Sequence, residues 1–197
     1  MKGMRLFKPA IYVKGCGAIL CCGAVLFLMV LSCCNKNGVR IPVMPDATQT
    51  GRNTMGAYVN NTLWVPAISF DNTGIDASYT IPFLQMDGIV EDASGVSKTE
   101  IFFNIHNFTG VGKYTLNTDP NNNNTDNSAQ CLKVNGEYVT DSLHQGTVIV
   151  THFDDKKHIV SGTFQIKLIN KNNPADSVTV SSGRFDVTCP LTVEVDG

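Results

Sequence analysis

Charged side chains are scarce in this chain of 197 residues, at 16% against the roughly 25% of typical soluble domains. Acidic residues are absent from the first 45 positions, whereas four basic residues lie in the first 14: Lys2, Arg5, Lys8 and Lys14. Without residues 1–32, 11 basic and 17 acidic side chains remain, a net charge of −6. Nucleic acid and anionic lipid headgroups both need a cationic face. We therefore expect no nucleic-acid partner.

Sequence patterns of common enzymes are also missing. The chain has no G-x-S-x-G nucleophile turn and no glycine pattern for phosphates or dinucleotides. Its four histidines lack metal-ligand spacing, and His106 alternates with Asn104 on an expected strand. Adjacent carboxylates such as Asp154 and Asp155 point to opposite sides of a strand, unlike a glycosidase pair. We expect no enzymatic activity, no metal and no cofactor.

An uncharged stretch, residues 15–32, follows the basic start, as in a secretory signal sequence. Its end, Val30-Leu31-Ser32-Cys33, resembles the bacterial lipobox. By that resemblance signal peptidase II removes residues 1–32, and Cys33 becomes an acylated first residue that holds the protein to the membrane through lipid. The alternative is an uncleaved signal anchor, because eighteen helical residues at about 1.5 Å each span roughly 27 Å.

Residues 33–53 have two prolines and few large apolar side chains, so we expect the acylated Cys33 to be followed by a flexible tether. Surface-displayed lipoproteins of Bacteroidota resemble one another in an acidic cluster just after this cysteine. Cys34 to Gly38 contain no acidic residue. The expected location is therefore the periplasmic face of the outer membrane.

From residue 54 to residue 197 the hydrophobic pattern has a period of two, which is typical of strands. Phe164, Ile166 and Leu168 alternate with polar residues, for example. Further runs lie at Ala77–Met86, Val178–Val180 and Phe185–Val187. Turn-forming residues separate the runs, and no apolar stripe of helical spacing continues for three turns. We expect an all-β domain, an antiparallel β-sandwich of about ten short strands, with a lipocalin-like barrel as the alternative.

Four segments of the chain, taken in order, support the all-β interpretation through a family resemblance. They are Asn53–Trp64, Gly112–Leu116, Ile159–Phe164 and Ser182–Val187. Together they resemble a family of uncharacterised Bacteroidota lipoproteins. The resemblance implies a small all-β lipoprotein module with no assigned activity.

Two cysteines fall within expected strands, Cys131 and Cys189. In an oxidising periplasm they could pair, and the long loop between them would then stabilise the fold by about 4 kcal/mol. Two buried free thiols are the alternative.

Two short segments, Asp141-Ser142-Leu143 and Asp176-Ser177-Val178, resemble the O-glycosylation acceptor of Bacteroidota, which makes Ser142 and Ser177 candidate sites. The polar segment Asp119–Ser128 is expected to be a solvated loop. Its oxygen atoms could hold Ca²⁺, but it lacks the glycine and final glutamate of a helix-loop-helix site.

Our leading hypothesis is a lipid-anchored, non-enzymatic binding or structural module of the cell envelope. One alternative is a small-ligand carrier, whose cavity would be lined by four rings: Phe102, Phe103, Phe108 and Phe153. Another is a carbohydrate-binding accessory protein, although Trp64 is expected in the core. The candidate ligands are a glycan, a small molecule or an envelope protein.

Replacement of the expected acylation site tests the anchor. We expect Cys33→Ala to remain a full-length, unacylated precursor, because the thiol that receives the lipid is missing, and Cys34→Ala to mature normally. Gel mobility and intact mass measure both outcomes. A Cys33→Ala product of mature size that carries acyl chains would contradict the assignment.

Overall fold

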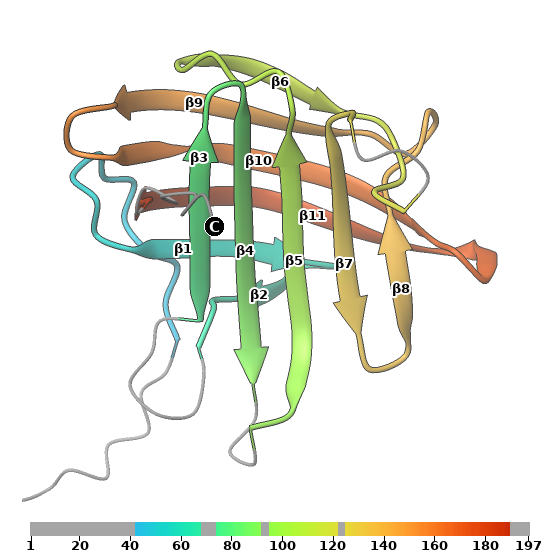
Figure 1. Cartoon of the computed structure of the whole chain (residues 1–197). Coiled ribbons are helices and arrows are strands. Elements are labelled where there is room, and N and C mark those ends of the chain that lie inside the picture. The colour runs from blue at the N-terminus through green and yellow to red at the C-terminus, as the bar shows by residue number, and fades with distance from the viewer. Residues whose placement is uncertain (1–41, 68–73, 92–94, 122–124, 190–197) are drawn as a thin grey trace, which may run out of the picture. The chain divides into compact units, whose positions relative to one another are not determined.

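The structure is a computed structural model that describes residues 42–67, 74–91, 95–121 and 125–189, all within one compact unit, Pro42–Gly197 (Figure 1). The expected signal sequence and Cys33 lie outside the described residues. The elements are β1 (Thr54–Val59), β2 (Thr62–Trp64), β3 (Ile75–Thr80), β4 (Phe83–Glu91), β5 (Ser97–Ile105), β6 (Gly112–Leu116), β7 (Ser128–Lys133), β8 (Gly136–Val139), β9 (Gly146–Asp154), β10 (Ile159–Asn170) and β11 (Asn173–Thr188). In the described ranges no helix has the length and apolar character to cross a membrane.

All eleven strands belong to one hydrogen-bonded sheet with antiparallel strand pairs, and the sheet is open. Strands β3, β4, β5, β7 and β8 form a front layer, and β1, β9, β10 and β11 pass behind it in a steeply different direction (Figure 1). The back layer also includes β2, paired with β1, and β6, paired with β9. The expected all-β class is confirmed, and two layers of one sheet are consistent with a β-sandwich rather than a closed barrel.

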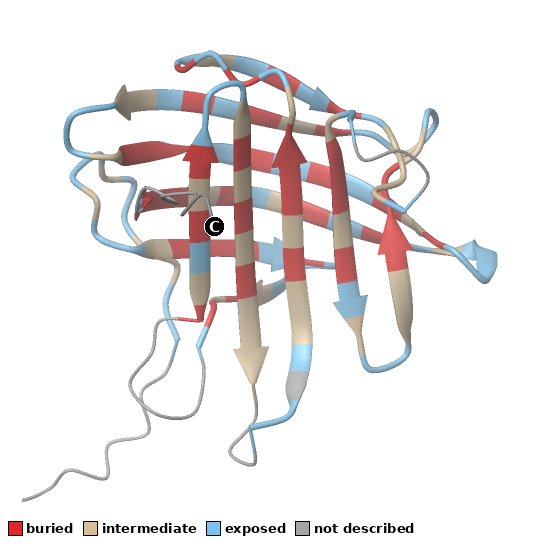
Figure 2. Cartoon of the chain, in the orientation of Figure 1, coloured by how far each residue is buried: buried red, intermediate tan, exposed pale blue. Residues whose placement is uncertain are grey.

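The core lies between the layers and is built by alternation along the strands (Figure 2). On β10, Phe164, Ile166 and Leu168 are buried and the residues between them are exposed, as the sequence pattern predicts. Phe103 of the front layer contacts Phe164 across the core, with ring centroids 5.6 Å apart. Burying each such side chain contributes about 1.5–3 kcal/mol. Apolar contact between the layers is therefore the main source of stability.

The rings that the carrier hypothesis placed around a cavity pack differently. Phe103 and Phe108 are fully buried, and Phe153 packs edge-on against Phe108 at 5.2 Å. Phe102 pairs with Asp87 of β4 on the outward face of the front layer. The interior at these positions is filled by side chains, which favours a packed sandwich over a carrier.

Two expected strands differ in extent. The run Ala77–Met86 is divided between β3 and β4, which form a hairpin around Ile81 and Pro82. Proline has no N–H to donate to a sheet, so a turn is the natural place for it. Conversely, the short runs near Val178 and Phe185 are parts of one 16-residue strand, β11.

Residues 42–53, which we name the strap, belong to the folded unit although we predicted them as the end of a flexible tether. The strap lies against the back layer, where Arg184 donates a hydrogen bond from Nη1 to the Pro45 carbonyl oxygen at 3.1 Å. A Cβ at Gly56 would lie 2.6 Å from Pro45 Cδ, so only glycine allows this contact. The expected tether is corrected at its C-terminal end.

Substitution of Gly162 tests the packing of the back layer. A Cβ there would lie 2.7 Å from Phe185 Cζ and collide with the Ile149 carbonyl oxygen. We expect Gly162→Ala to lower the free energy of unfolding by about 1–3 kcal/mol or more, measured by urea denaturation. Gly112→Ala is the matched control, because its nearest neighbouring atom is 3.5 Å away. Equal losses in both variants would contradict the packing argument.

Candidate functional site

Asp186 organises the outward face of the back layer. Its neighbours on β11, Phe185 and Val187, point into the core, so alternation directs Asp186 outward, where it is nevertheless only 1% exposed. Five groups donate hydrogen bonds to its carboxylate: Thr48 Oγ1 (2.5 Å), Gly51 N (2.8 Å), Ser161 Oγ (2.8 Å), Thr50 N (3.1 Å) and Arg52 N (3.3 Å). Four of the five belong to the strap. Asp186 therefore fastens the strap across β10 and β11.

The hydrogen bonds also determine the ionisation of Asp186. Burial by itself would raise the pKa of the carboxyl, but the bonds from Thr48, Thr50, Ser161 and Gly51 outweigh it and lower the pKa to about 2. Asp186 is therefore a carboxylate at any physiological pH.

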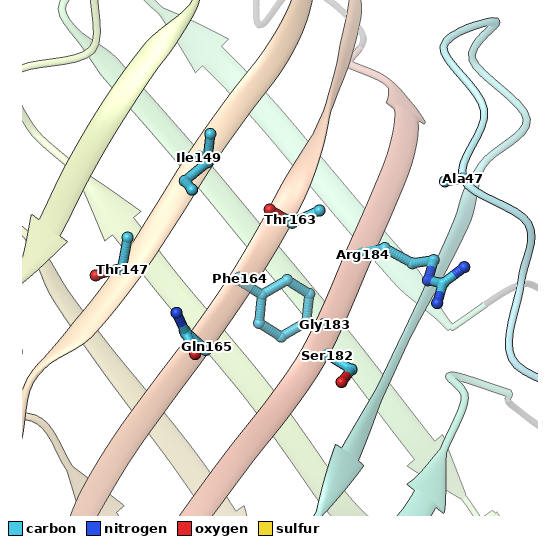
Figure 3. A pocket seen from close by; sticks show the side chains of 9 residues that line it. All are labelled: Ala47, Thr147, Ile149, Thr163, Phe164, Gln165, Ser182, Gly183 and Arg184. Carbon is cyan, nitrogen blue, oxygen red and sulfur yellow. The ribbon is translucent and has the colours of Figure 1, made fainter.

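A groove of about 450 Å³ runs beside the strap on the same face (Figure 3). It crosses β9, β10 and β11, and its lining residues are Ala47, Thr147, Ile149, Thr163, Phe164, Gln165, Ser182, Gly183 and Arg184. A smaller hollow of about 190 Å³ shares Thr147 and Gln165 with it and extends to Lys167 and Thr179. We name the two together the strap groove.

A β-bulge shapes the strap groove. Phe164 pairs with Gly183 and Ile166 with Val180, so Gln165 of β10 faces two residues of β11. One of these, Ser182, has a positive φ of 52°. Such bulges bend a strand and redirect its side chains, which accounts for a hollow at this position in an otherwise regular sheet.

The strap groove combines apolar surface from Ala47, Ile149 and Phe164 with polar and cationic groups. Its lining and extension carry hydroxyl and amide groups together with Arg184 and Lys167, and no Asp or Glu is among the lining residues. Arg184 extends from β11 toward the strap near Ala47 (Figure 3). Lys113 of β6 pairs with Ile149, which places another exposed cation on the same face. This arrangement suits a ligand with hydroxyl and acidic groups.

The candidate disulfide between Cys131 and Cys189 does not form, and both cysteines are buried free thiols. Cys189 interacts electrostatically with Asp76 and Tyr79 of β3, whereas Cys131 lies on β7. Strands β4 and β5 separate β3 from β7, a distance of about 14 Å at roughly 4.8 Å per strand. A disulfide needs Cα atoms within about 7 Å. Burial raises the pKa of each thiol to about 12, which makes both unreactive.

The two candidate O-glycosylation sites are both exposed serines, Ser142 in the β8–β9 connection and Ser177 on β11. The aspartate before each has a structural contact of its own. Asp141 Oδ1 accepts a hydrogen bond from the Leu143 amide at 2.8 Å, and Asp176 Oδ2 accepts one from the Tyr138 hydroxyl at 2.7 Å. These hydrogen bonds account for the presence of both aspartates without a glycan. Glycosylation of the two serines stays a prediction.

The aromatic residues considered for sugar binding are mostly interior. Trp64 is 5% exposed, and Tyr79, Tyr114 and Tyr138 are buried, whereas Tyr58 is 37% exposed. The expectation that Trp64 fills the core is therefore confirmed. Among the described residues there is also no group of three or more His, Cys, Asp or Glu side chains that could hold a metal ion.

Sequence reasoning did not identify the strap groove. Thr147, Gln165 and Arg184 are ordinary outward residues of strands, and only the pairing of β9, β10 and β11 brings them together. In the sequence, Ser182–Val187 carries a family resemblance but no sign of a groove. A serine next to a glycine within a strand was the one local signal of the bulge.

The fold and the groove define an all-β module with a hollow on the outer face of its back layer. The chain matches the family described as "Domain of unknown function (DUF6252)" over residues 84–187, from β4 to β11. These are 104 of 197 residues, more than half of the chain, and the chain belongs to this family. The expectation of an uncharacterised domain is confirmed. No curated protein and no solved structure matches the chain.

Substitution of Asp186 tests the fastening of the strap. The folded pKa lies below the ordinary 3.8, so its contribution of about 2 kcal/mol is present above pH 4 and is lost as the pH falls toward 2. We expect Asp186→Asn to lose at least this amount at pH 7 and to flatten the acid limb of the stability curve. Urea denaturation between pH 2 and pH 7 measures both effects.

Asp46→Asn is the control, because Asp46 is an exposed carboxylate of the same strap. We expect it to change the free energy of unfolding by less than about 0.5 kcal/mol. Identical pH profiles for the wild type and Asp186→Asn would show that the carboxylate does not fasten the strap.

Proposed function

We propose that this protein is a lipid-anchored, non-enzymatic binding module of the bacterial cell envelope. In this proposal acylated Cys33 holds it to the periplasmic face of the outer membrane, as in the Bacteroidota lipoproteins that the sequence resembles. The basic and apolar start of the chain and the lipobox-like Val30–Cys33 support the anchor. The compact unit that begins at Pro42 supports a folded body close to it in sequence.

The observation that carries the binding role is the strap groove. It is a hollow of about 450 Å³, within the usual range of ligand sites, and it carries hydroxyls, an amide and a guanidinium on three neighbouring strands. The folded body is acidic, yet around the groove this face carries three cations, Lys113, Lys167 and Arg184, and the one carboxylate of β11 beside them, Asp186, is buried under the strap. A local excess of cations on an acidic protein selects ligands by charge.

We infer that the ligand of the strap groove is an acidic polysaccharide of the envelope. Its carboxylates pair with Arg184 and Lys167, and its hydroxyls pair with the threonines and Gln165. Three cations are fewer than the roughly six to ten phosphate contacts of a typical DNA-binding protein. The groove is therefore compatible with our expectation that nucleic acid is not a partner.

Charge reversal tests this function. We expect Arg184→Glu and Lys167→Glu each to weaken binding to polygalacturonate or alginate by about tenfold or more at low salt, because each replaces an attraction by a repulsion. Binding of the wild type should weaken as salt rises. Titration calorimetry on the protein purified from membranes measures the affinities.

Lys156→Glu is the matched control, since Lys156 is an exposed lysine in the turn between β9 and β10. We expect it to bind like the wild type. Equal weakening in all three variants would indicate a dependence on net charge alone, and absence of binding to either polymer would refute the proposed ligand class.

A further inference from the structure

A further hollow lies between the two layers, where β4 and β7 end and β5 begins. Its volume is about 360 Å³, and it shares no lining residue with the strap groove. We name it the end pocket. Its lining residues are Pro42, Val59, Asn60, Thr62, Leu63, Trp64, Val65, Val90, Thr99 and Lys133. None of the four phenylalanines expected around a carrier cavity is among them, so the end pocket is a different space from the filled interior.

The front wall of the end pocket is one row of three strands. Val90 of β4 pairs with Thr99 of β5, and Thr99 pairs with Lys133 of β7. Each lies two positions from a buried residue of its own strand, so alternation directs all three side chains toward the back layer. Inward positions of a sandwich are normally apolar, and lysine is among the residues least often buried. The row therefore brings an unusual cation into the space between the layers.

The back wall is the β1–β2 hairpin. Val59 and Trp64 are buried, and Thr62 pairs with Val59. Trp64 also packs on Gly88 of β4, where an added Cβ would lie 2.6 Å from Trp64 Cη2. The layers thus touch at Gly88, and two positions further along β4, at Val90, they leave a hollow whose floor is the Trp64 ring.

The end pocket is accessible from solvent. Pro42, Asn60 and Thr62 are exposed, and the side chains of the front wall are half-buried rather than buried. The volume lies within the usual range of small-molecule sites. A ligand therefore reaches both walls without any movement of the strands.

The lining of the end pocket is largely apolar and carries one charge. Six of its ten residues are apolar, Asp and Glu are absent, and Lys133 is the single cation among them. The Lys133 ammonium lies 6.0 Å from the centroid of the Tyr138 ring. Asp176 interacts with Lys133 electrostatically, but its Oδ2 already accepts hydrogen bonds from Tyr138 and Asn170, at 2.7 and 3.1 Å. Within the described ranges Lys133 forms no salt bridge, so its ammonium can donate to an anionic ligand.

We propose that the end pocket binds a long-chain fatty acid, with the alkyl chain between the layers and the carboxylate paired with Lys133. An alkyl chain gains free energy by contact with the valine, leucine and tryptophan side chains, whereas a ligand rich in hydroxyl groups would lose hydrogen bonds there. The stem of a lysine packs along apolar surface while its ammonium stays near water. The one positive charge of the pocket thus matches the one negative charge of the ligand.

The place of Pro42 favours a ligand that comes from the membrane. Pro42 is nine positions after Cys33, and nine residues span at most about 32 Å. The proposed lipid anchor would therefore keep the end pocket close to the bilayer, into which fatty acids partition. This step rests on the proposed function, whereas the walls and the cation do not. Failure of the fatty-acid proposal would leave the strap groove and its ligand untouched.

Photo-cross-linking tests the proposal on the full protein, purified from membranes and reconstituted into phosphatidylcholine vesicles. The probe is palmitate with a diazirine on its alkyl chain, and peptide mass spectrometry locates the label. We expect label on residues of the end pocket. Unlabelled palmitate should compete at least tenfold more strongly than its methyl ester, because only the carboxylate pairs with Lys133.

Two substitutions test the head and the chain of the ligand separately. Lys133→Glu should reduce labelling about tenfold and remove the preference for palmitate over the methyl ester, because it repels the carboxylate. Lys133→Arg should keep that preference. Thr99→Phe should reduce labelling by both the acid and an ester form of the probe, because the larger side chain fills the pocket.

Lys156→Glu and Thr115→Phe are the matched controls, since they make the same changes at exposed positions in the β9–β10 turn and on β6. We expect both to be labelled like the wild type. Equal labelling of all variants, label only outside the end pocket, or equal competition by palmitate and its methyl ester would overturn the inference. Absence of label, as when the protein's own lipid fills the pocket, would also overturn it.

Discussion

β10 changes its partner along its length, pairing with β9 as far as Ile166 and with β8 from Ile169. Its other side pairs with β11 throughout, so β10 belongs to the back layer while its end joins the front layer. This exchange folds one hydrogen-bonded sheet over an apolar core. It leaves two outward faces, and the strap groove lies on that of the back layer.

The second constraint is the burial of one charge. A carboxylate with almost no exposed surface needs several hydrogen-bond donors, and Asp186 obtains four of its five from the strap. The position of the strap is therefore determined by the need of Asp186 on β11 for hydrogen-bond donors. Under the proposed lipid anchor, a pull on the N-terminal segment would meet the Arg184–Pro45 hydrogen bond and then the bonds of Asp186. The strap also forms one wall of the groove through Ala47.

Alternation was enough to predict the class of fold. The period-two run on β10 predicts its buried face correctly, because each buried side chain contacts the opposite layer regardless of which strand lies beside it. The hairpin at Pro82 and the continuity of β11 were not predicted, since both depend on pairing partners that a single sequence does not show. The strap was missed for the same reason, because its partner Asp186 is separated from Thr50 by 136 positions.

The sites were less predictable than the fold. The strap groove depends on the pairing of β9, β10 and β11 and on the bulge at Ser182, which are properties of the folded state. The sequence left a disulfide and two buried free thiols open for Cys131 and Cys189, because spacing in sequence does not show the two strands that separate β3 from β7.

The net charge of the chain also hides a feature of the folded state, because it averages over two faces that differ in their charged side chains. The sheet places three carboxyl groups, Asp76, Asp87 and Glu100, on the outward side of the front layer with Lys98, and three cations, Lys113, Lys167 and Arg184, on that of the back layer with the buried Asp186. Within a Debye length of about 8 Å at physiological salt, a ligand responds to the face it touches and hardly at all to the opposite one. A protein with an acidic average thus carries a cation-rich face, and topology rather than composition decides where that face lies.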